Sequence, residues 1–177
     1  LHDLPGATAT NPLYAYANTD APVGTFGGEA ELRREWKEGW MASVSYSFQK
    51  SRYLRSGAIG DFLAFKRDPS LREVPNSPNH LASVKGGVPI LGRALMLMNR
   101  ITFEGPRWDR NDREGANQPV QRQTSAALLW DIVLSGNEAR WGLSYAFGVY
   151  NAFNTQWAVP ISAEFRQATM PQSGRTF

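Results

Sequence analysis

The chain has 177 residues, of which 42% are apolar, 20% charged and 12% aromatic, and it contains no cysteine. This composition argues against a disordered chain and against a disulfide-stapled secreted domain, and the lack of cysteine excludes thiolate metal sites and a cysteine nucleophile. No apolar run approaches the roughly 18 to 20 residues that a membrane-spanning helix needs. The formal charge is only +3 and the two signs are interleaved, so nucleic acid is not an expected partner.

Apolar and polar residues alternate along several segments, the pattern of a strand with two different faces. A first strand is predicted near residues 16–36, and four charged residues share one of its faces: Glu29, Glu31, Arg33 and Glu35. A second strand is predicted over residues 40–52. Its even positions are aromatic or aliphatic, whereas its odd positions are mostly serine.

Further strands of about ten residues are predicted at residues 80–89, 93–104, 123–134 and 139–151, and another begins at 175. The connections alternate between short turns at 37–39, 89–93 and 135–139 and long polar loops at 55–78, 105–123 and 154–175. Short turns at one end and long loops at the other are typical of transmembrane β-barrels. The predicted fold class is therefore all-β, an antiparallel up-and-down transmembrane barrel.

Aromatic residues gather at both ends of the predicted strands. Beside the short turns stand Trp36, Trp40 and Trp141, and near the long loops stand Tyr53, Phe103, Trp108, Tyr150 and Phe153. Two aromatic girdles at the membrane interfaces would have this distribution. Six full strands and the start of a seventh cannot close a membrane barrel, whose smallest form has eight. We therefore expect an incomplete barrel.

A soluble antiparallel sandwich or lipocalin-like barrel that binds an apolar ligand is the alternative interpretation. Its polar faces would then meet water, yet one of them is built from small residues, namely Gly142, Ser144, Ala146 and Gly148, instead of the lysine and glutamate usual on a solvated surface. Three loops of about twenty residues without structure of their own are also uncommon in a compact soluble domain.

Six motifs follow one another in the order and spacing of a known family. They are Tyr16-Ala17-Asn18 with Gly27 to Leu32, Gly39 to Phe48, Asn76-Ser77-Pro78-Asn79-His80-Leu81, Leu129-Trp130-Asp131, Val149-Tyr150-Asn151-Ala152-Phe153-Asn154, and Pro171-Gln172-Ser173-Gly174-Arg175-Thr176-Phe177. Together they resemble the C-terminal β-barrel of TonB-dependent outer-membrane receptors. The resemblance covers nearly the whole chain.

This resemblance implies a 22-stranded barrel with a plugged lumen, of which residues 1–177 would be the C-terminal portion. The plug domain and the TonB-binding segment would lie outside this chain, and the last strand is expected to be truncated at Phe177. The implied function is uptake of a scarce small-molecule ligand, siderophore-like or other, through the outer membrane of a Gram-negative bacterium. Implied partners are outer-membrane lipid, lipopolysaccharide, the plug and, indirectly, TonB. A receptor that senses or adheres without transporting remains an alternative.

No catalytic constellation, cofactor site or metal site is expected, and the chain is not expected to be an enzyme. We interpret His80 as a hydrogen-bonding residue at the start of a strand. The charges Glu29, Glu31, Arg33 and Glu35 are expected to face the lumen, because a basic residue facing lipid at mid-bilayer would cost about 2 to 4 kcal/mol. Arg100 is expected to point inward, and Arg34 to lie at the short-turn interface.

The candidate extracellular ligand contacts are loop cations that would suit an anionic ligand: Arg52, Arg55, Lys66, Arg67 and Arg72. The same residues would also serve to bind lipopolysaccharide phosphates or to solubilise the loop.

Overall fold

The computed structural model describes residues 2–3, 14–15, 22–55, 73–91, 94–109, 123–161, 165 and 167–177. Predictions that fall on residues 16–21 therefore lie outside the described residues. Within these ranges the chain is all-β, and no helix there is long and apolar enough to cross a membrane. The chain forms two compact units, one from Leu1–Gly24 and Arg52–Arg72, the other from Thr25–Ser51 and Glu73–Phe177.

The first unit contains a short antiparallel pair, β1 (His2–Asp3) with β2 (Tyr14–Ala15). It also holds the outer ends of two long strands of the second unit, where Leu54 N donates to Pro22 O at 2.8 Å. Leu54 is buried, and a side chain at Gly24 would bring its Cβ to 3.1 Å from Leu54 Cδ1. The glycine thus allows the leucine to pack closely against the backbone.

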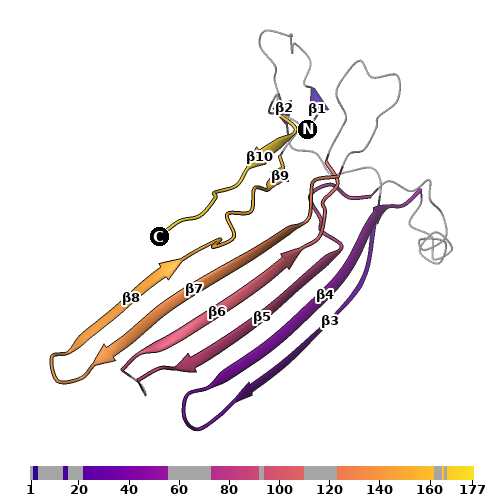
Figure 1. The fold of residues 1–177 in the computed structure, drawn as a ribbon. Coiled ribbons are helices and arrows are strands. Elements are labelled where there is room, and N and C mark those ends of the chain that lie inside the picture. The colour runs from indigo at the N-terminus through magenta and orange to yellow at the C-terminus, as the bar shows by residue number, and fades with distance from the viewer. Residues whose placement is uncertain are drawn as a thin grey trace. The chain divides into compact units, whose positions relative to one another are not determined.

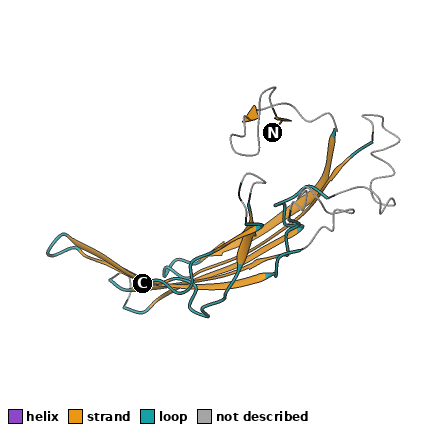
Figure 2. Cartoon of the chain, turned by 90° about the horizontal axis from the view of Figure 1, so that it is seen from above, coloured by secondary structure: helices purple, strands orange, loops and turns teal. Residues whose placement is uncertain are grey.

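The second unit is built on a six-stranded antiparallel sheet in which every strand neighbours the next along the chain (Figure 1). Its strands are β3 (Val23–Glu35), β4 (Met41–Tyr53), β5 (His80–Pro89), β6 (Met96–Glu104), β7 (Ala127–Glu138) and β8 (Leu143–Val149). Figure 2 shows them as a single bent layer. The predicted all-β, up-and-down arrangement is confirmed, but the described sheet is open: β3 and β8 are its two edges.

The register places like residues side by side across neighbouring strands. Ser45 of β4 pairs with Ser83 of β5, which pairs with Thr102 of β6. Val44, Val84 and Ile101 form the adjacent row in the same way. Because side chains alternate between the two sides of a strand, these rows lie on opposite faces of the sheet.

We call the two sides the polar face and the apolar face. The polar face carries Glu29, Glu31, Ser43, Ser45, Ser47, Ser83, Lys85, Arg100, Thr102 and Asp131, together with Met96, Met98 and Val133 nearer the short turns. The apolar face carries Leu32, Trp36, Val44, Tyr46, Val84, Ile101, Phe103, Leu128, Tyr145 and Phe147. The predicted division of β4 into an aromatic side and a serine side is confirmed.

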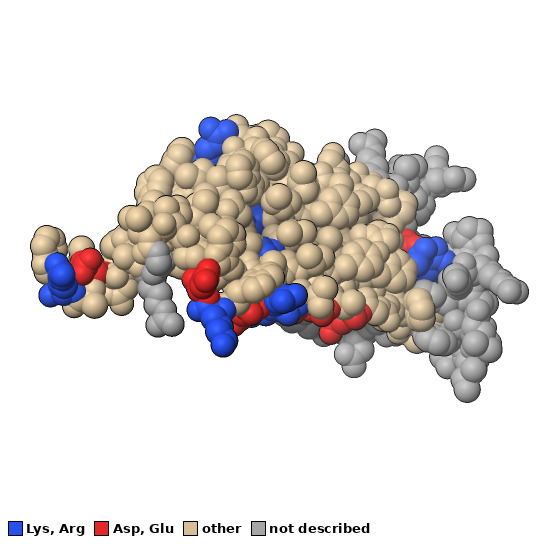
Figure 3. Space-filling view, turned by 60° about the horizontal axis from the view of Figure 1, so that its bottom comes forward, with Lys and Arg blue, Asp and Glu red and all other residues tan. Residues whose placement is uncertain are grey.

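Burial on the apolar face is unusually low for side chains of this kind. Leu32 is 76% exposed, Val44 51% and Phe147 61%, and the buried apolar residues of the described chain are Leu54 and Ala127 alone. Figure 3 shows a broad surface with few charged side chains, and most of the lysine, arginine, aspartate and glutamate lies toward its margins. No second layer covers the apolar face within the described ranges.

Two of the three short turns lie where they were predicted. The β3–β4 turn is closed by Trp36 N donating to Trp40 O at 3.0 Å, and Gly39 supplies its positive φ of 91°. The second turn joins β5 to β6 after Pro89. The third was predicted at residues 135–139, which is wrong: β7 continues to Glu138 and the turn uses Gly142, at φ 63°.

The third turn was predicted in the wrong place because Gly136 resembles a turn residue, whereas the structure uses it for close packing inside β7. Gly136 pairs with Tyr145, whose hydroxyl donates to Ala94 O. A Cβ at position 136 would collide with both the Tyr145 hydroxyl and Ala94 O. Glycine inside a strand often marks such a close approach.

The loop predicted at residues 154–175 contains an antiparallel pair that the prediction missed, β9 (Ala158–Pro160) with β10 (Thr169–Pro171). Beyond it the chain returns to the sheet. Tyr150 and Thr176 exchange two backbone hydrogen bonds, of 2.9 and 3.1 Å. The chain therefore begins to pair beside β8 at the place where a further strand was expected.

Candidate functional site

The described residues place two of the predicted lumen-facing charges, Glu29 and Glu31, in a hollow on the polar face. The hollow has a volume of about 550 Å³, and hydroxyl side chains of β4, β5 and β6 line part of its wall beside apolar ones such as Ala30 and Leu81. Its lining includes Glu29, Glu31, Ser45, Ser47, Ser83 and Thr102. Ser43 Oγ, just beyond this set, donates to Glu31 Oε1 at 3.1 Å.

The chemistry of this hollow is that of a hydrated or hydrogen-bonding wall. Carboxylates accept hydrogen bonds, and serine and threonine hydroxyls both donate and accept. The Ser83 hydroxyl is shielded from solvent and has no hydrogen-bond partner, although buried polar groups normally have one. The hollow therefore offers groups for a polar solute, for water or for a polar protein surface.

The other two predicted charges of β3 interact with each other. Arg33 Nε donates to Glu35 Oε1 at 2.9 Å, and both side chains are well exposed. An exposed pair of this kind contributes only about 0 to 1 kcal/mol to stability. Its effect is local: it leaves Glu29 and Glu31 as the carboxylates of the β3 charge row that line the hollow.

A second polar cluster, which the sequence did not predict as a unit, joins β6 and β7 to the end of β8. Asp131 Oδ2 accepts from Arg100 Nε at 3.0 Å and from Arg100 Nη2 at 2.7 Å. Its other oxygen, Oδ1, accepts from the backbone N of Asn151 at 3.0 Å. Arg100 therefore points to the polar face, as predicted, and its partner carboxylate also holds the chain beyond β8.

Asn151 is the centre of this cluster. It is buried, adopts φ 50°, and follows a bulge: Val149 pairs with Ile132, whereas the next sheet bond runs from Ala152 N to Trp130 O. The extra residue frees the Asn151 amide for Asp131. The Asn151 side chain accepts from Thr155 N at 2.9 Å and donates to Thr155 O at 3.0 Å.

The returning chain is fastened to the same corner. Asn154 Oδ1 accepts from Arg175 N at 3.0 Å, and Arg175 Nε donates to Ala152 O at 3.1 Å. The segment from 171 to 177 is thus held against the end of β8 by side-chain and backbone bonds together. The sequence signal for this corner was present in the motifs at 129–131, 149–154 and 171–177, but their contact with one another was not predicted.

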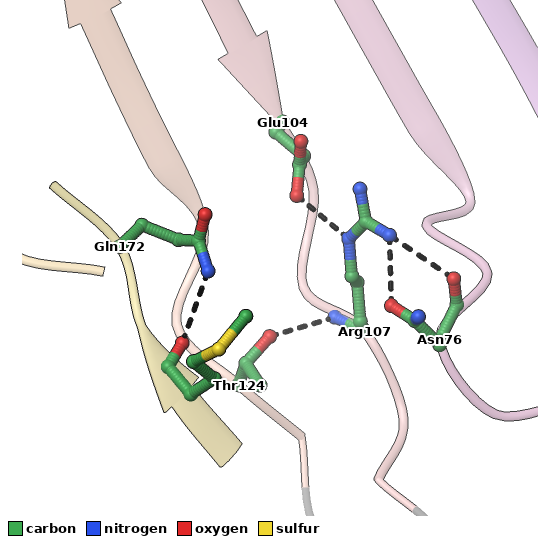
Figure 4. Close-up of polar contacts among 6 residues, drawn as sticks. Asn76, Glu104, Arg107, Thr124 and Gln172 are labelled. Atoms are coloured by element: carbon green, nitrogen blue, oxygen red, sulfur yellow. Dashed lines mark hydrogen bonds and ion pairs between the residues drawn. The ribbon is translucent and has the colours of Figure 1, made fainter. Parts of the chain in front are cut away.

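At the roots of two long loops, Arg107 connects three segments (Figure 4). Its Nε pairs with Glu104 Oε1 at 2.6 Å, its Nη1 donates to Asn76 Oδ1 at 2.8 Å, and its backbone N donates to Thr124 Oγ1 at 3.1 Å. The arginine and the glutamate are both mostly buried. This arrangement fixes where the loops leave the sheet.

His80 begins β5, and its Nδ1 lies 2.8 Å from the Tyr46 hydroxyl. The expectation of a hydrogen-bonding histidine at a strand start is therefore confirmed. Its ring also contacts Phe48, with ring centres 5.2 Å apart. Across the described residues, no group of three or more histidine, cysteine, aspartate or glutamate side chains is placed to hold a metal ion.

Only two of the five predicted ligand-contact cations, Arg52 and Arg55, are among the described residues. Arg52 ends up buried near the end of β4, whereas Arg55, just after that strand, is exposed. Both belong to the first unit. Lys66, Arg67 and Arg72 lie outside the described residues, so ligand contact by this set stays a prediction.

Comparison with known proteins does not identify the chain. It matches no family model, and neither the curated proteins nor the solved structures yield a match. The features that indicate a function are therefore the two faces of the sheet and the motifs at its ends.

Proposed function

We propose that the six-stranded sheet is part of the wall of an outer-membrane β-barrel, with the apolar face against lipid and the polar face toward the lumen. The observation that carries this proposal is the row of large apolar side chains left 40 to 76% exposed on one side, such as Leu32, Val44 and Phe147. Fully burying one such side chain is worth about 1.5 to 3 kcal/mol. Lipid supplies that burial without a second protein layer.

The strand lengths and the turns support the same arrangement. Five of the six strands, β3 to β7, contain 9 to 13 residues, against about 9 to 11 needed to cross the hydrocarbon layer at a tilt. In outer-membrane barrels the short turns face the periplasm and the long loops face outside. We therefore place the β3–β4 turn at the periplasmic surface.

The wider proposal is that this wall belongs to a TonB-dependent receptor that takes up a scarce small molecule, siderophore-like or other. Its support is the order of the six motifs and the way their residues meet. Asp131, Asn151 and Arg175 come from three different motifs and share one polar corner. In this proposal the polar face and its hollow would contact the plug, and TonB would act through the plug.

The two alternatives differ in what they require of the faces. A soluble protein that binds an apolar ligand needs its apolar face enclosed, and the exposure of that face in the described chain does not favour this. A receptor that senses without transporting would use the same wall, so only a transport measurement separates it from the proposal.

Membrane placement is tested with single cysteines, because the chain has none of its own. Val44→Cys and Ser45→Cys are adjacent positions on opposite faces of β4. In phosphatidylcholine vesicles, a water-soluble maleimide is expected to label position 45 and to spare position 44. The soluble alternative would be favoured if positions 44 and 45 were labelled equally in vesicles and if both were also labelled in solution without detergent.

Transport is tested in the source cell. Deleting the coding segment is expected to abolish accumulation of a radiolabelled ferric catecholate complex, and an uncoupler that collapses the proton gradient is expected to have the same effect on the intact cell. Binding of the complex at the cell surface without accumulation would overturn transport and favour the sensing receptor.

A further inference from the structure

A second hollow lies at the β3–β4 turn, away from the polar face. It has a volume of about 520 Å³ and is lined by Trp36, Lys37, Glu38 and Trp40. The two tryptophans flank the turn, where Trp36 N donates to Trp40 O. Both tryptophan residues are more than 40% exposed. Two aromatic walls therefore stand beside one cation and one anion.

Arg34, near the end of β3, places a second cation beside Trp36. It shares a strand side with Trp36, and its guanidinium carbon lies 5.0 Å from the centre of the Trp36 ring. A guanidinium keeps its N–H donors in its own plane, which suits the binding of a phosphate. Within the described ranges, Arg34, Lys37 and Glu38 form no ion pair with one another or with any other residue.

We propose that the hollow between Trp36 and Trp40 binds a phosphoethanolamine headgroup of a membrane lipid, with Arg34 and Lys37 holding the phosphate and Glu38 accepting from the ammonium. The proposal rests on the membrane location proposed above. The charges of the site complement those of a zwitterion. The two cations, Arg34 and Lys37, would bind the phosphate, and the Glu38 carboxylate would bind the ammonium. The indole faces add attraction for the ammonium through their π-systems.

Glu38 gives the site its selectivity among lipids. A primary ammonium donates hydrogen bonds to a carboxylate, whereas the quaternary ammonium of phosphatidylcholine has no N–H to donate. Phosphatidylglycerol carries the phosphate without any cation, so Glu38 would repel it. The expected order of binding is phosphatidylethanolamine first, then the choline and glycerol lipids.

The experiment uses the full chain in a neutral maltoside detergent with equal amounts of phosphatidylethanolamine, phosphatidylcholine and phosphatidylglycerol of identical acyl chains. Retained lipid is counted by native mass spectrometry. Wild-type protein is expected to keep about three- to fivefold more of the ethanolamine lipid than of either competitor, the size expected of one exposed charged contact.

The variants separate the contributions. Glu38→Gln is expected to remove the preference for ethanolamine over choline and to raise retention of the glycerol lipid, whereas Lys37→Gln is expected to lower retention of all three. The matched controls are Glu138→Gln and Arg140→Gln at the β7–β8 turn, which has a single neighbouring tryptophan, Trp141. These controls are expected to leave the preference unchanged.

The outcomes distinguish this inference from the function on which it rests. If lipid is retained without preference, or if the preference survives Glu38→Gln, the headgroup site is wrong while the membrane wall stands. If the protein retains no lipid and does not enter vesicles, the membrane proposal itself is overturned.

Discussion

At the residue scale, the position that most of the polar corner depends on is Asn151. Its backbone amide goes to Asp131 and its side chain bridges to Thr155, while its φ of 50° is one that asparagine tolerates better than most residues. A buried amide that both donates and accepts is costly to remove, because its partners are then left without hydrogen bonds. The corner therefore tolerates few substitutions at this position.

We predict that Asn151→Gly destabilises the chain by about 1 to 3 kcal/mol, because glycine keeps the positive φ but abandons the bonds to Thr155. Asn151→Ala is expected to lose about 1 kcal/mol more through backbone strain. The measurement is guanidinium unfolding in detergent micelles. Wild-type stability in Asn151→Gly would show that the side-chain bonds do not hold the corner.

The Arg100–Asp131 pair is predicted to be a modest contributor, because the arginine is half exposed although the carboxylate is mostly buried. A double-mutant cycle with Arg100→Gln and Asp131→Asn is expected to give a coupling energy of about 0.5 to 1 kcal/mol. Raising the salt concentration is expected to reduce it. A coupling of zero would mean that Asp131 acts only through Asn151.

The side of the sheet on which a residue lies was predictable from the sequence, whereas its contacts were not. Arg100 was placed on the polar side by its parity with neighbouring residues, which depends only on local alternation. Its partner Asp131 stands thirty-one positions away and could not be found without the register of β6 with β7. Alternation gives the side of a sheet on which a residue lies, but only strand pairing gives its neighbours.

At the element scale, β4 offers a direct comparison between the two faces. Val44 and Ser45 are adjacent, and their partners on β5 are Val84 and Ser83. In a membrane, Val44→Lys is expected to cost about 2 to 4 kcal/mol, as a charge on the lipid face does near the midplane. Ser45→Lys serves as the matched control on the polar face, where the charge stays near water and carboxylates, and is expected to cost far less.

The measurement for this pair is urea unfolding of both variants in phosphatidylcholine vesicles. If the apolar face were in water, Val44→Lys would be an exposed surface substitution and would stay within about 0.5 kcal/mol of wild type. Equal, small effects in both variants would therefore contradict a lipid-facing side.

Element boundaries were predictable where residue type and backbone demand agreed. At the β3–β4 turn, Gly39 is a residue type that favours turns, and it adopts the positive φ of 91° that this turn requires. At residues 135–139 the sequence Ser-Gly-Asn resembles a turn, yet the glycine is required inside β7 by the ring of Tyr145. A long-range contact of this kind has no local signature. The pair β9 and β10 was missed for another reason, because strands of three residues are too short to show alternation.

At the scale of the whole molecule, the described sheet has two open edges, β3 and β8. An edge strand presents unpaired N–H and C=O groups that can pair with another chain. The exchange between Tyr150 and Thr176 shows that the even-numbered residues at the end of β8 direct their backbone groups away from β7. By alternation, Ala146 directs its N–H outward too, whereas Phe147 bonds toward β7.

We therefore predict that isolated chains associate through the β8 edge and that Ala146→Pro blocks this association. Proline removes the outward N–H and leaves the bonds to β7 intact, so the fold is expected to survive. Phe147→Pro is the contrasting variant, because it removes an N–H from the β7–β8 ladder and is expected to destabilise the sheet by about 3 kcal/mol or more. Sedimentation velocity in detergent micelles measures the assembly, and circular dichroism checks the fold. Ala146→Pro that stays folded and assembles like wild type would place the association at β3 or on a face of the sheet.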